Sequence, residues 1–338
     1  MRYALCAMRF RGLIVGQVLI GVDLGGTNVR IGVVTPKGRV LKKEEYALDP
    51  SQGGSKIVEG LVSNLKNFLQ ERIGRNNQLL GIGIGIAGVI DMKRGRVINS
   101  PNIPELNGFG IREFLTKRIS SPIAIENDAN AFALGEGWVG AAKGSKDYCG
   151  ITLGTGVGGG IVTNGEILHG SGGMASEVGH MIIDPEGPLC GCGGRGCLEV
   201  YASATGIKRM ALEAIEKGEG GKIVKRAGDK VEEVTSEKVF QAAQSGDEAA
   251  QKIFHEMGRF LGLGLVNLIH LFDPEKIVIG GKASRAWNAF IKTTMEVVRE
   301  RAMEGSRGKA KVVQAKCGDD AGILGAAYVA LRSMKHRA

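Results

Sequence analysis

The sequence predicts an α/β protein built from two similar halves, and three observations support that prediction. Strand and helix patterns alternate along the 338 residues, the same order of elements returns after about residue 148, and each half holds a glycine turn between two strands. The length suggests about two domains. Two such halves facing each other form a cleft, and clefts are where ligands bind.

The first half begins with strands separated by turns. Apolar alternation and turn residues predict strands, in order, over residues 18–24, 28–34, 39–46, 79–86 and 123–126. Apolar residues at helical spacing predict helices over residues 57–73, 111–119 and 129–139. The strand at 79–86 alternates glycine with isoleucine.

The second half repeats this order. Strands are predicted over residues 148–153, 159–163, 277–279 and 312–315, with a hairpin turn at Asn164-Gly165. Helices are predicted over residues 203–217, 236–245, 247–271, 284–303 and 321–334. No linker rich in Gly, Ser or Pro separates the halves, so we expect the boundary to be a hinge.

Glycine is in large excess, at 54 of 338 residues. Only eight prolines are present, which excludes a collagen-like repeat. The glycines alternate with Ile, Val and Leu, and 43% of the residues are hydrophobic, which excludes a disordered linker. The excess therefore indicates tight turns, close backbone approaches or ligand loops.

The net charge of +9 arises mostly at the two ends of the chain. Residues 1–20 and 331–338 each carry three basic residues and no acidic ones, which leaves the rest nearly balanced. We therefore predict no nucleic-acid partner. The apolar stretch at 13–22 is too short to span a membrane and lacks a signal-peptidase site. A cytoplasmic protein with no membrane partner is expected.

Two common phosphate motifs are excluded. The Gly-Lys pairs are followed by Ile or Ala, so none completes a P-loop. Gly154, Gly156 and Gly159 match Gly-x-Gly-x-x-Gly, but a hairpin follows where the dinucleotide fold needs a helix.

A glycine turn between strands can still bind phosphate through its backbone N–H groups. The two turns span Asp23–Asn28, with Gly25, Gly26 and Thr27, and Thr152–Gly159, with Gly154, Thr155 and Gly156. One turn per half is suited to gripping a nucleotide from both sides, with Asp23 holding water on Mg²⁺. Ordinary hairpin turns are the alternative.

Glu126-Asn127-Asp128 ends a strand and begins a helix. Asp128 fits two roles, an ordinary helix N-cap or the carboxylate that accepts a proton from a hydroxyl in a kinase. A sugar needs several polar side chains, and the candidates are Asn102, Asn107, Glu177, His180 and Glu199. Spacing alone does not show that they converge.

Three cysteines lie within eight residues, in Cys190-Gly-Cys192-Gly-Gly-Arg-Gly-Cys197. Structural zinc takes four ligands, commonly Cys₄ or Cys₃His. His180 is the best candidate for the fourth ligand and His169 the weaker one. The pattern predicts a structural Zn²⁺ that pins the loop carrying Glu199; three buried cysteines without a metal are the alternative.

Several of these motifs together resemble the ROK family of repressors, uncharacterised reading frames and sugar kinases, and most of all its bacterial-type glucokinases. The resemblance runs from about residue 20 to residue 331. The motifs are Asp23-Leu-Gly-Gly-Thr-Asn28, Gly83-Ile-Gly-Ile-Ala-Gly88, Glu126-Asn-Asp128, Leu153-Gly-Thr-Gly-Val-Gly-Gly159, Glu177-Val-Gly-His180 and the cysteine knuckle ending at Glu199. The knuckle with its upstream histidine is the specific signal.

The resemblance implies two actin-like (ribonuclease H-like) ATPase domains closing on ATP and a hexose. It implies a general base at Asp128 and sugar contacts from Asn102, Asn127, Glu177, His180 and Glu199. His180 would hold zinc with one ring nitrogen and face the sugar with the other. Gly280 and Gly281 would lie under the adenosine. The expected reaction is phosphorylation of glucose at its 6-hydroxyl by ATP with Mg²⁺.

The expected domains are residues 20–126 with 321–336, and residues 127–320 with the knuckle at 190–199. Family members imply a homo-oligomer, a dimer or tetramer. An N-acetylglucosamine or N-acetylmannosamine kinase shares the catalytic residues and stays open. A repressor is disfavoured, because residues 1–19 cannot hold a helix-turn-helix module. That leader is longer than the resemblance implies, and Met8 is an alternative start.

Overall fold

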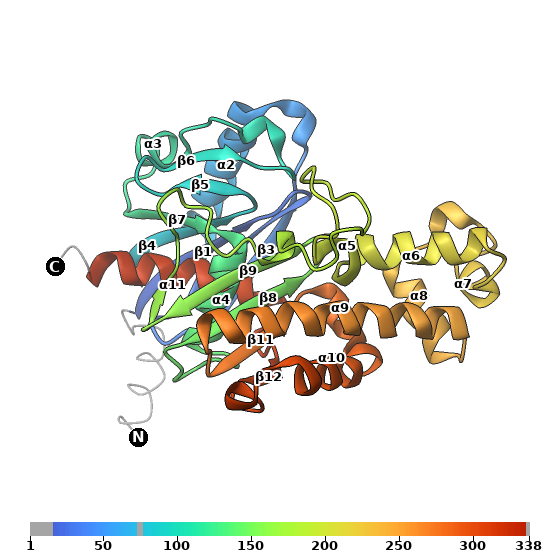
Figure 1. Cartoon of the computed structure of the whole chain (residues 1–338). Coiled ribbons are helices and arrows are strands. Elements are labelled where there is room, and N and C mark those ends of the chain that lie inside the picture. The colour runs from blue at the N-terminus through green and yellow to red at the C-terminus, as the bar shows by residue number, and fades with distance from the viewer. Residues whose placement is uncertain (1–15, 73–76, 336–338) are drawn as a thin grey trace, which may run out of the picture. The chain divides into compact units, whose positions relative to one another are not determined.

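The structure is a computed structural model that describes residues 16–72 and 77–335 (Figure 1). The basic residues and Cys6 of the leader, Met8, the last residue of the predicted first helix and the end of the C-terminal tail lie outside these residues. None of the helices in the described part of the chain is long and apolar enough to cross a membrane.

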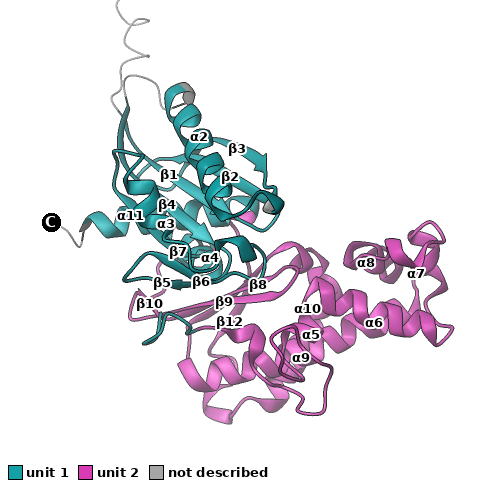
Figure 2. Cartoon of the chain, turned by 90° about the horizontal axis from the view of Figure 1, so that it is seen from above, with its two compact units in different colours: residues 1–140, 169–175, 319–338 teal, residues 141–168, 176–318 magenta. Residues whose placement is uncertain are grey.

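The chain forms two compact units, shown in separate colours in Figure 2. Unit 1 comprises residues 1–140, 169–175 and 319–338, and unit 2 comprises residues 141–168 and 176–318. Unit 1 is therefore assembled from three separate pieces of chain.

Unit 1 contains a five-stranded sheet, a small two-stranded sheet and four α-helices within its described residues. The strands are β1 (Gly16–Leu24), β2 (Asn28–Val34), β3 (Val40–Ala47), β4 (Asn77–Ile86), β5 (Val89–Asp91), β6 (Arg96–Asn99) and β7 (Ile123–Asn127). The helices are α2 (Gly54–Arg72), α3 (Ile111–Thr116), α4 (Asp128–Trp138) and α11 (Ala321–Lys335), with short 3₁₀ turns at Pro50–Gln52, Pro104–Leu106 and Gly318–Asp320.

Unit 2 contains a second five-stranded sheet and six α-helices within its described residues. The strands are β8 (Tyr148–Leu153), β9 (Val157–Thr163), β10 (Glu166–Ile167), β11 (Lys276–Gly280) and β12 (Lys311–Gln314). The helices are α5 (Glu199–Ala202), α6 (Ala204–Glu216), α7 (Gly221–Arg226), α8 (Ser236–Gln244), α9 (Glu248–Phe272) and α10 (Trp287–Arg301), with 3₁₀ turns at Val178–His180, Val231–Glu233, Lys282–Ala286 and Glu304–Ser306.

The two large sheets share one topology. Their strand orders are β3-β2-β1-β4-β7 and β10-β9-β8-β11-β12. In each sheet the central strand, β1 or β8, pairs antiparallel with the strand that follows it and parallel with β4 or β11. The repetition predicted from the sequence is therefore present in the fold.

The alternation of glycine and isoleucine in β4 separates the two faces of the unit 1 sheet. Ile82, Ile84 and Ile86 are fully buried in the core that α2 and α3 complete. The opposite face carries Gly83, where an added Cβ would lie 1.7 Å from the carbonyl oxygen of Ala326 in α11. Helix α11 therefore packs backbone to backbone on the sheet, beside β4 and β1 (Figure 1).

This packing confirms close backbone approach as one use of the excess glycines. An added Cβ at Gly21 of β1 would lie 2.0 Å from the oxygen of Ile323, and one at Gly325 would lie 1.6 Å from the oxygen of Ala131 in α4. Several glycines of unit 1 therefore serve the packing of α11.

Most elements agree with the sequence-based predictions, with a few differences. Helix α3 ends at Thr116 rather than at residue 119, and β9 begins at Val157 rather than at residue 159, which shortens the glycine turn. Helix α10 begins at Trp287, after a 3₁₀ turn. Strands β5, β6 and β10 and helices α5 and α7 are too short to show a hydrophobic period, and no prediction included them.

Candidate active site

The first glycine turn lies between β1 and β2, in unit 1. It is closed by a hydrogen bond of 3.0 Å from the backbone N–H of Gly25 to the oxygen of Asn28. Gly26 lies against the loop that carries Asn102, because an added Cβ there would be 2.9 Å from the Cβ of Asn102. The structure thus brings two predicted contact regions, the turn and the Asn102 loop, together.

Asp23 at the end of β1 forms an ion pair that the sequence analysis missed. In the register of the hairpin it lies opposite Arg30 of β2, and the Arg30 guanidinium donates to Asp23 Oδ2 over 2.6 Å. Burial raises the pKa of Asp23, and the charge and hydrogen bond of Arg30 oppose that rise. Arg30 also donates to the backbone oxygen of Asp319.

The junction of β7 and α4 fixes the orientation of Asp128. Asn127 is the N-cap, since its Oδ1 accepts the N–H of Asn130 over 3.0 Å, so the N-cap interpretation of Asp128 is wrong. Asp128 is the first helical residue. Its Oδ1 accepts the N–H of Ala129 over 2.9 Å and Nδ2–H of Asn127 over 3.1 Å. A carboxylate is thus held at the N-terminus of a helix, where the macrodipole stabilises negative charge.

Glu126, immediately before Asn127, is buried. Its Oε1 accepts from the backbone of Asn127 and the side chain of Asn130, each over 3.0 Å. Its Oε2 lies 2.8 Å from Nε2 of His169. His169 therefore pairs with a carboxylate in unit 1 and is not the fourth metal ligand, which corrects the weaker of the two predictions.

Asn107, a candidate for sugar binding, forms hydrogen bonds within its own loop. Its Oδ1 accepts the N–H of Ser100 over 2.7 Å, and its Nδ2 donates to Asn99 over 3.3 Å. Asn102 in the same loop is exposed.

The second glycine turn joins β8 to β9, in unit 2. The N–H of Gly154 donates to the oxygen of Gly156 over 2.9 Å, two residues on, whereas the bond of the first turn spans three residues. Gly281, after β11, lies beside this turn, because an added Cβ would be 2.4 Å from the oxygen of Leu153. Its φ of +87° also favours glycine. The predicted phosphate turn and the predicted adenosine contact are therefore neighbours.

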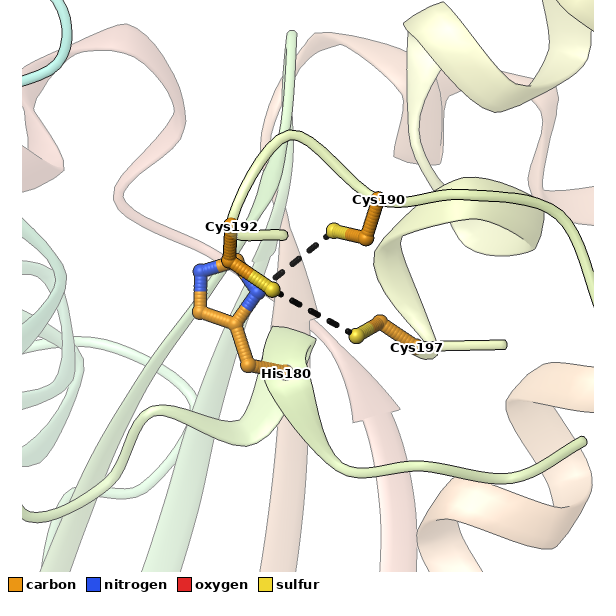
Figure 3. A group of neighbouring side chains, drawn as sticks. All are labelled: His180, Cys190, Cys192 and Cys197. Atoms are coloured by element: carbon orange, nitrogen blue, oxygen red, sulfur yellow. Dashed lines mark hydrogen bonds between the residues drawn. The ribbon is translucent and has the colours of Figure 1, made fainter. Parts of the chain in front are cut away.

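Four predicted metal ligands come together in unit 2, and Figure 3 shows their side chains converging. The donor atoms of His180, Cys190, Cys192 and Cys197 all lie within 4.8 Å of one another. Sγ of Cys190 is 3.7 Å from Nδ1 of His180, and Sγ of Cys192 is 3.7 Å from Sγ of Cys197.

The backbone explains why residues ten to seventeen positions apart meet. The segment after His180 pairs with the end of the knuckle: the N–H of Leu198 donates to Met181 and the N–H of Ile183 donates to Gly196, both over 2.9 Å. Gly196 has a φ of +62°, and an added Cβ would lie 1.5 Å from the oxygen of Asp184. Only glycine fits where these two segments cross.

The cluster fits a zinc ion in its donor set and spacing. Zinc bonds of about 2.3 Å to sulfur in a tetrahedron place two sulfurs about 3.8 Å apart, close to the distance between Cys192 and Cys197. Burial raises the pKa of Cys197 to about 12 and also raises the pKa of Cys190. A bound cation would offset that penalty on the thiolates.

Two predicted sugar contacts, Glu177 and Glu199, lie beside this cluster. Glu199 Oε1 is 3.7 Å from Sγ of Cys190. Burial raises the pKa of Glu177, the charge of His180 opposes that rise, and the charge of Glu199 adds to it. The structure therefore places Glu177, His180 and Glu199 within electrostatic reach of one another.

Comparisons with known proteins agree with this arrangement. The model of the ROK family matches residues 19–333. The chain belongs to the ROK family. The glucokinase of Thermotoga maritima is 38% identical over 92% of this chain and 96% of its own. The glucokinase of Halalkalibacterium halodurans is 38% identical over 92% of this chain and 94% of its own.

A solved structure supports the same family. The ROK family glucokinase from Streptomyces griseus, in complex with glucose and AMPPNP, has a TM-score of 0.80 and 34% identity. The match covers 93% of this chain and 99% of that one. These findings confirm the predicted family and α/β fold class, and they identify the chain as a ROK family sugar kinase.

Proposed function

We propose that this ROK family kinase transfers the γ-phosphoryl group of ATP to the 6-hydroxyl of glucose, with Asp128 as the general base. The assignment of the base rests on the two hydrogen bonds that orient the carboxylate of Asp128. Two donors, Ala129 N–H and Asn127 Nδ2–H, hold one oxygen at the start of α4. A carboxylate held in one orientation suits proton abstraction from a positioned hydroxyl.

In this mechanism the sugar hydroxyl gives its proton to Asp128 as its oxygen attacks the γ-phosphorus. The bond from that phosphorus to the bridging oxygen breaks, and ADP leaves. Little covalent chemistry falls to the protein in phosphoryl transfer, so positioning and charge stabilisation dominate.

Sugar recognition is assigned to the residues that the family resemblance implies. Asn127 donates Nδ2–H to Gly88 and to Asp128 and accepts one N–H, so an Oδ1 lone pair remains for a sugar hydroxyl. Asn102 from unit 1 and Glu177, His180 and Glu199 from unit 2 complete the proposed set. Zinc, held by Cys190, Cys192, Cys197 and Nδ1 of His180, would fix the imidazole orientation.

The nucleotide is assigned to the two glycine turns. Backbone and hydroxyl donors of Gly25, Gly26, Thr27 and Asn28, and of Gly154, Thr155 and Gly156, would meet its phosphates, and Gly280 and Gly281 its adenosine. Mg²⁺ is commonly bound by one or two carboxylates together with substrate phosphates. Asp23, at the end of β1 beside the first turn, would supply such a carboxylate.

The substrate is tested by measuring ADP release with glucose, mannose, fructose, N-acetylglucosamine and N-acetylmannosamine. We expect the highest kcat/KM with glucose, because the two glucokinases above are 38% identical to this chain. A preference for an N-acetylated sugar would favour the hexosamine kinase instead. No activity on any sugar would overturn the proposal.

The base is tested with Asp128→Asn. We expect kcat to fall by roughly a hundredfold to ten-thousandfold, while glucose binding measured by calorimetry persists. Asp49→Asn removes an exposed carboxylate from the same unit and serves as the control. Near-normal kcat in Asp128→Asn would contradict the assignment.

A further inference from the structure

We propose that Glu199 is a positioning residue that ties the Cys/His cluster to the second glycine turn, so that loss of zinc weakens nucleotide binding in unit 2. The inference rests on the proposed function, in which this turn binds phosphate. It gives Glu199 a task beyond its expected contact with the sugar.

The two oxygens of Glu199 face different features. Oε2 accepts the backbone N–H of Val157, the first residue after the turn, over 2.9 Å. Oε1 lies 3.7 Å from Sγ of Cys190, a ligand of the cluster. An added Cβ at Gly156 would lie 2.2 Å from Oε2, so the turn approaches the carboxylate directly. One side chain therefore lies between the predicted metal ligands and the turn.

The segment that carries Glu199 also supports the rest of the turn. The N–H of Ala204 donates to the oxygen of Gly154, and Oγ1 of Thr205 donates to the oxygen of Thr155, each over 2.8 Å. Residues 199–205 therefore contact each turn residue from Gly154 to Gly156 and also Val157, the residue that follows. A shift of this segment would therefore displace the backbone of the turn.

The segment is anchored on both sides of Glu199. Leu198 is fully buried and packs on Gly264 of α9, where an added Cβ would be 2.8 Å from its side chain. Cys197, one residue earlier, and Cys190 are the buried ligands of the cluster. Zinc would fix these two ligands relative to each other, and thereby anchor the segment that carries Glu199 through Cys197.

A backbone phosphate site depends on a preformed arrangement of N–H groups. Without zinc, the four ligands have no common partner, and Cys197, two residues before Glu199, no longer anchors the segment that holds the Glu199 carboxylate against Val157. The turn then samples other conformations, and a phosphate that binds must first order the turn, which costs binding free energy. Nucleotide affinity should fall even with no sugar present.

The test measures the Kd of ADP by calorimetry without sugar, so that sugar contacts of Glu199 play no part. With zinc bound, we expect Glu199→Ala to weaken ADP binding about tenfold, the effect of losing one charge-assisted hydrogen bond. Glu199→Gln keeps an acceptor for Val157 and should lose much less. Glu216→Gln, which removes an exposed carboxylate from α6 of the same unit, is the matched control and should change nothing.

The second part of the experiment removes zinc with a chelator. Removing zinc from the wild-type chain should also weaken ADP binding about tenfold, and should add little in Glu199→Ala, because both changes break one connection. Circular dichroism and metal content show whether each sample is folded and loaded. If chelation unfolds the chain, the zinc-loaded variants decide.

The inference is overturned if zinc-loaded Glu199→Ala binds ADP within twofold of the wild type. It is also overturned if Glu199→Gln loses as much affinity as Glu199→Ala. Failure of the proposed function has a different signature, because the wild-type chain would then bind no ADP or phosphorylate no sugar.

Discussion

At the scale of single residues, the pairing of Asp23 with Arg30 connects the first glycine turn to the fold. The two residues lie directly opposite in the β1–β2 hairpin, and Arg30 is also bonded to the backbone oxygen of Asp319, just before α11. Asp23 itself lies under α11, since an added Cβ at Gly322 would be 2.5 Å from its Oδ2. The carboxylate proposed for Mg²⁺ is thus held by a neighbouring strand and covered by the last helix.

Arg30→Met should destabilise the chain, because it leaves a buried carboxylate without its counter-charge. We expect a loss of about 2 kcal/mol in the free energy of unfolding near pH 7, less than for a fully buried pair since Arg30 is partly exposed. Urea denaturation measures the loss. The double variant Arg30→Met with Asp23→Asn should recover part of it, and equal instability of the single and double variants would contradict this explanation.

The same pair predicts a dependence on pH. The pKa of Asp23 in the folded chain is raised above its ordinary value of 3.8. At a pH between the ordinary and the raised pKa, the native state therefore binds more protons than the unfolded state. The contribution of this group to the free energy of unfolding therefore falls as pH rises through that window. Arg30→Met should raise the pKa of Asp23 further. The difference in the free energy of unfolding between this variant and the wild type should therefore become smaller as the pH is lowered.

Cys149 should be chemically inert in the folded chain. It is the second residue of β8, which pairs with a strand on each side, and burial raises its pKa to about 12, so almost no thiolate exists at pH 8. Mass spectrometry after brief treatment with iodoacetamide should find Cys149 unmodified and the partly exposed Cys317 alkylated. Both should react in guanidinium chloride; early labelling of Cys149 without denaturant would refute the prediction.

The sequence indicates the proposed base and the set of metal ligands but not the partners of individual side chains. The four ligands follow from spacing and chemistry, since three cysteines in eight residues leave few alternatives. The pairing of Asp23 with Arg30 could have been predicted from the hairpin, because a turn centred between the two residues places them opposite each other. The pairing of Glu126 with His169 was not available, because 43 residues separate them and only the fold of unit 1 brings them together.

At the scale of elements, the glycines of β1 and β4 allow α11 to lie directly on the sheet. A sheet and a helix normally keep side chains between their backbones, and Gly21 and Gly83 remove them at the contact. The isoleucines on the other face of β4 fill the core beneath α2 and α3. The same strand therefore has one face for close approach and one for hydrophobic burial.

Gly83→Ala should destabilise unit 1 strongly. The new Cβ would meet the carbonyl oxygen of Ala326 at 1.7 Å, so α11 must shift. We expect a loss of about 3 kcal/mol in the free energy of unfolding, measured by urea denaturation. Gly60→Ala is the matched control: it lies on the exposed face of α2 with no atom near its Cβ, and should stabilise by about 0.5–1 kcal/mol. Equal effects would refute the packing role.

The predictions of elements succeeded where a period is repeated and failed where an element is short. Helix α9 shows seven helical turns of apolar spacing, and β2 and β8 agree with the structure at both ends. Helix α7 has six residues and β5 has three, too few for a period to emerge. The sequence showed the excess of glycine, but the packing of α11 on β4 depends on tertiary contacts that spacing does not contain.

At the scale of the whole molecule, two sheets of one topology support different tasks. Unit 1 carries the proposed base and the first glycine turn, and unit 2 carries the metal cluster and the second turn. Each turn joins the central strand of its sheet to the next one. The repeated fold thus supplies two equivalent turns, while the helices and loops added to each unit differ.

Removal of zinc should act on unit 2 and spare unit 1. Hydrogen exchange after chelation should show lost protection at the N–H groups of Cys190, Ile183 and Leu198, whose bonds hold the knuckle together. Protection in β4 of unit 1 should not change. Cys192→Ser should lose zinc and show the same pattern without a chelator, with Cys317→Ser as the control. Unchanged exchange in the knuckle would contradict a structural role for the metal.

The three-piece assembly of unit 1 has a consequence for synthesis on the ribosome. Its sheet emerges first, but α11 is encoded at the far end, after all of unit 2. At about 5–20 residues per second, the roughly 180 residues in between take on the order of 10–40 s to translate. During that interval the glycine face of β1 and β4 is not covered by α11. The unit that is begun first is therefore completed last, and this face must stay free of contacts with other chains until translation ends.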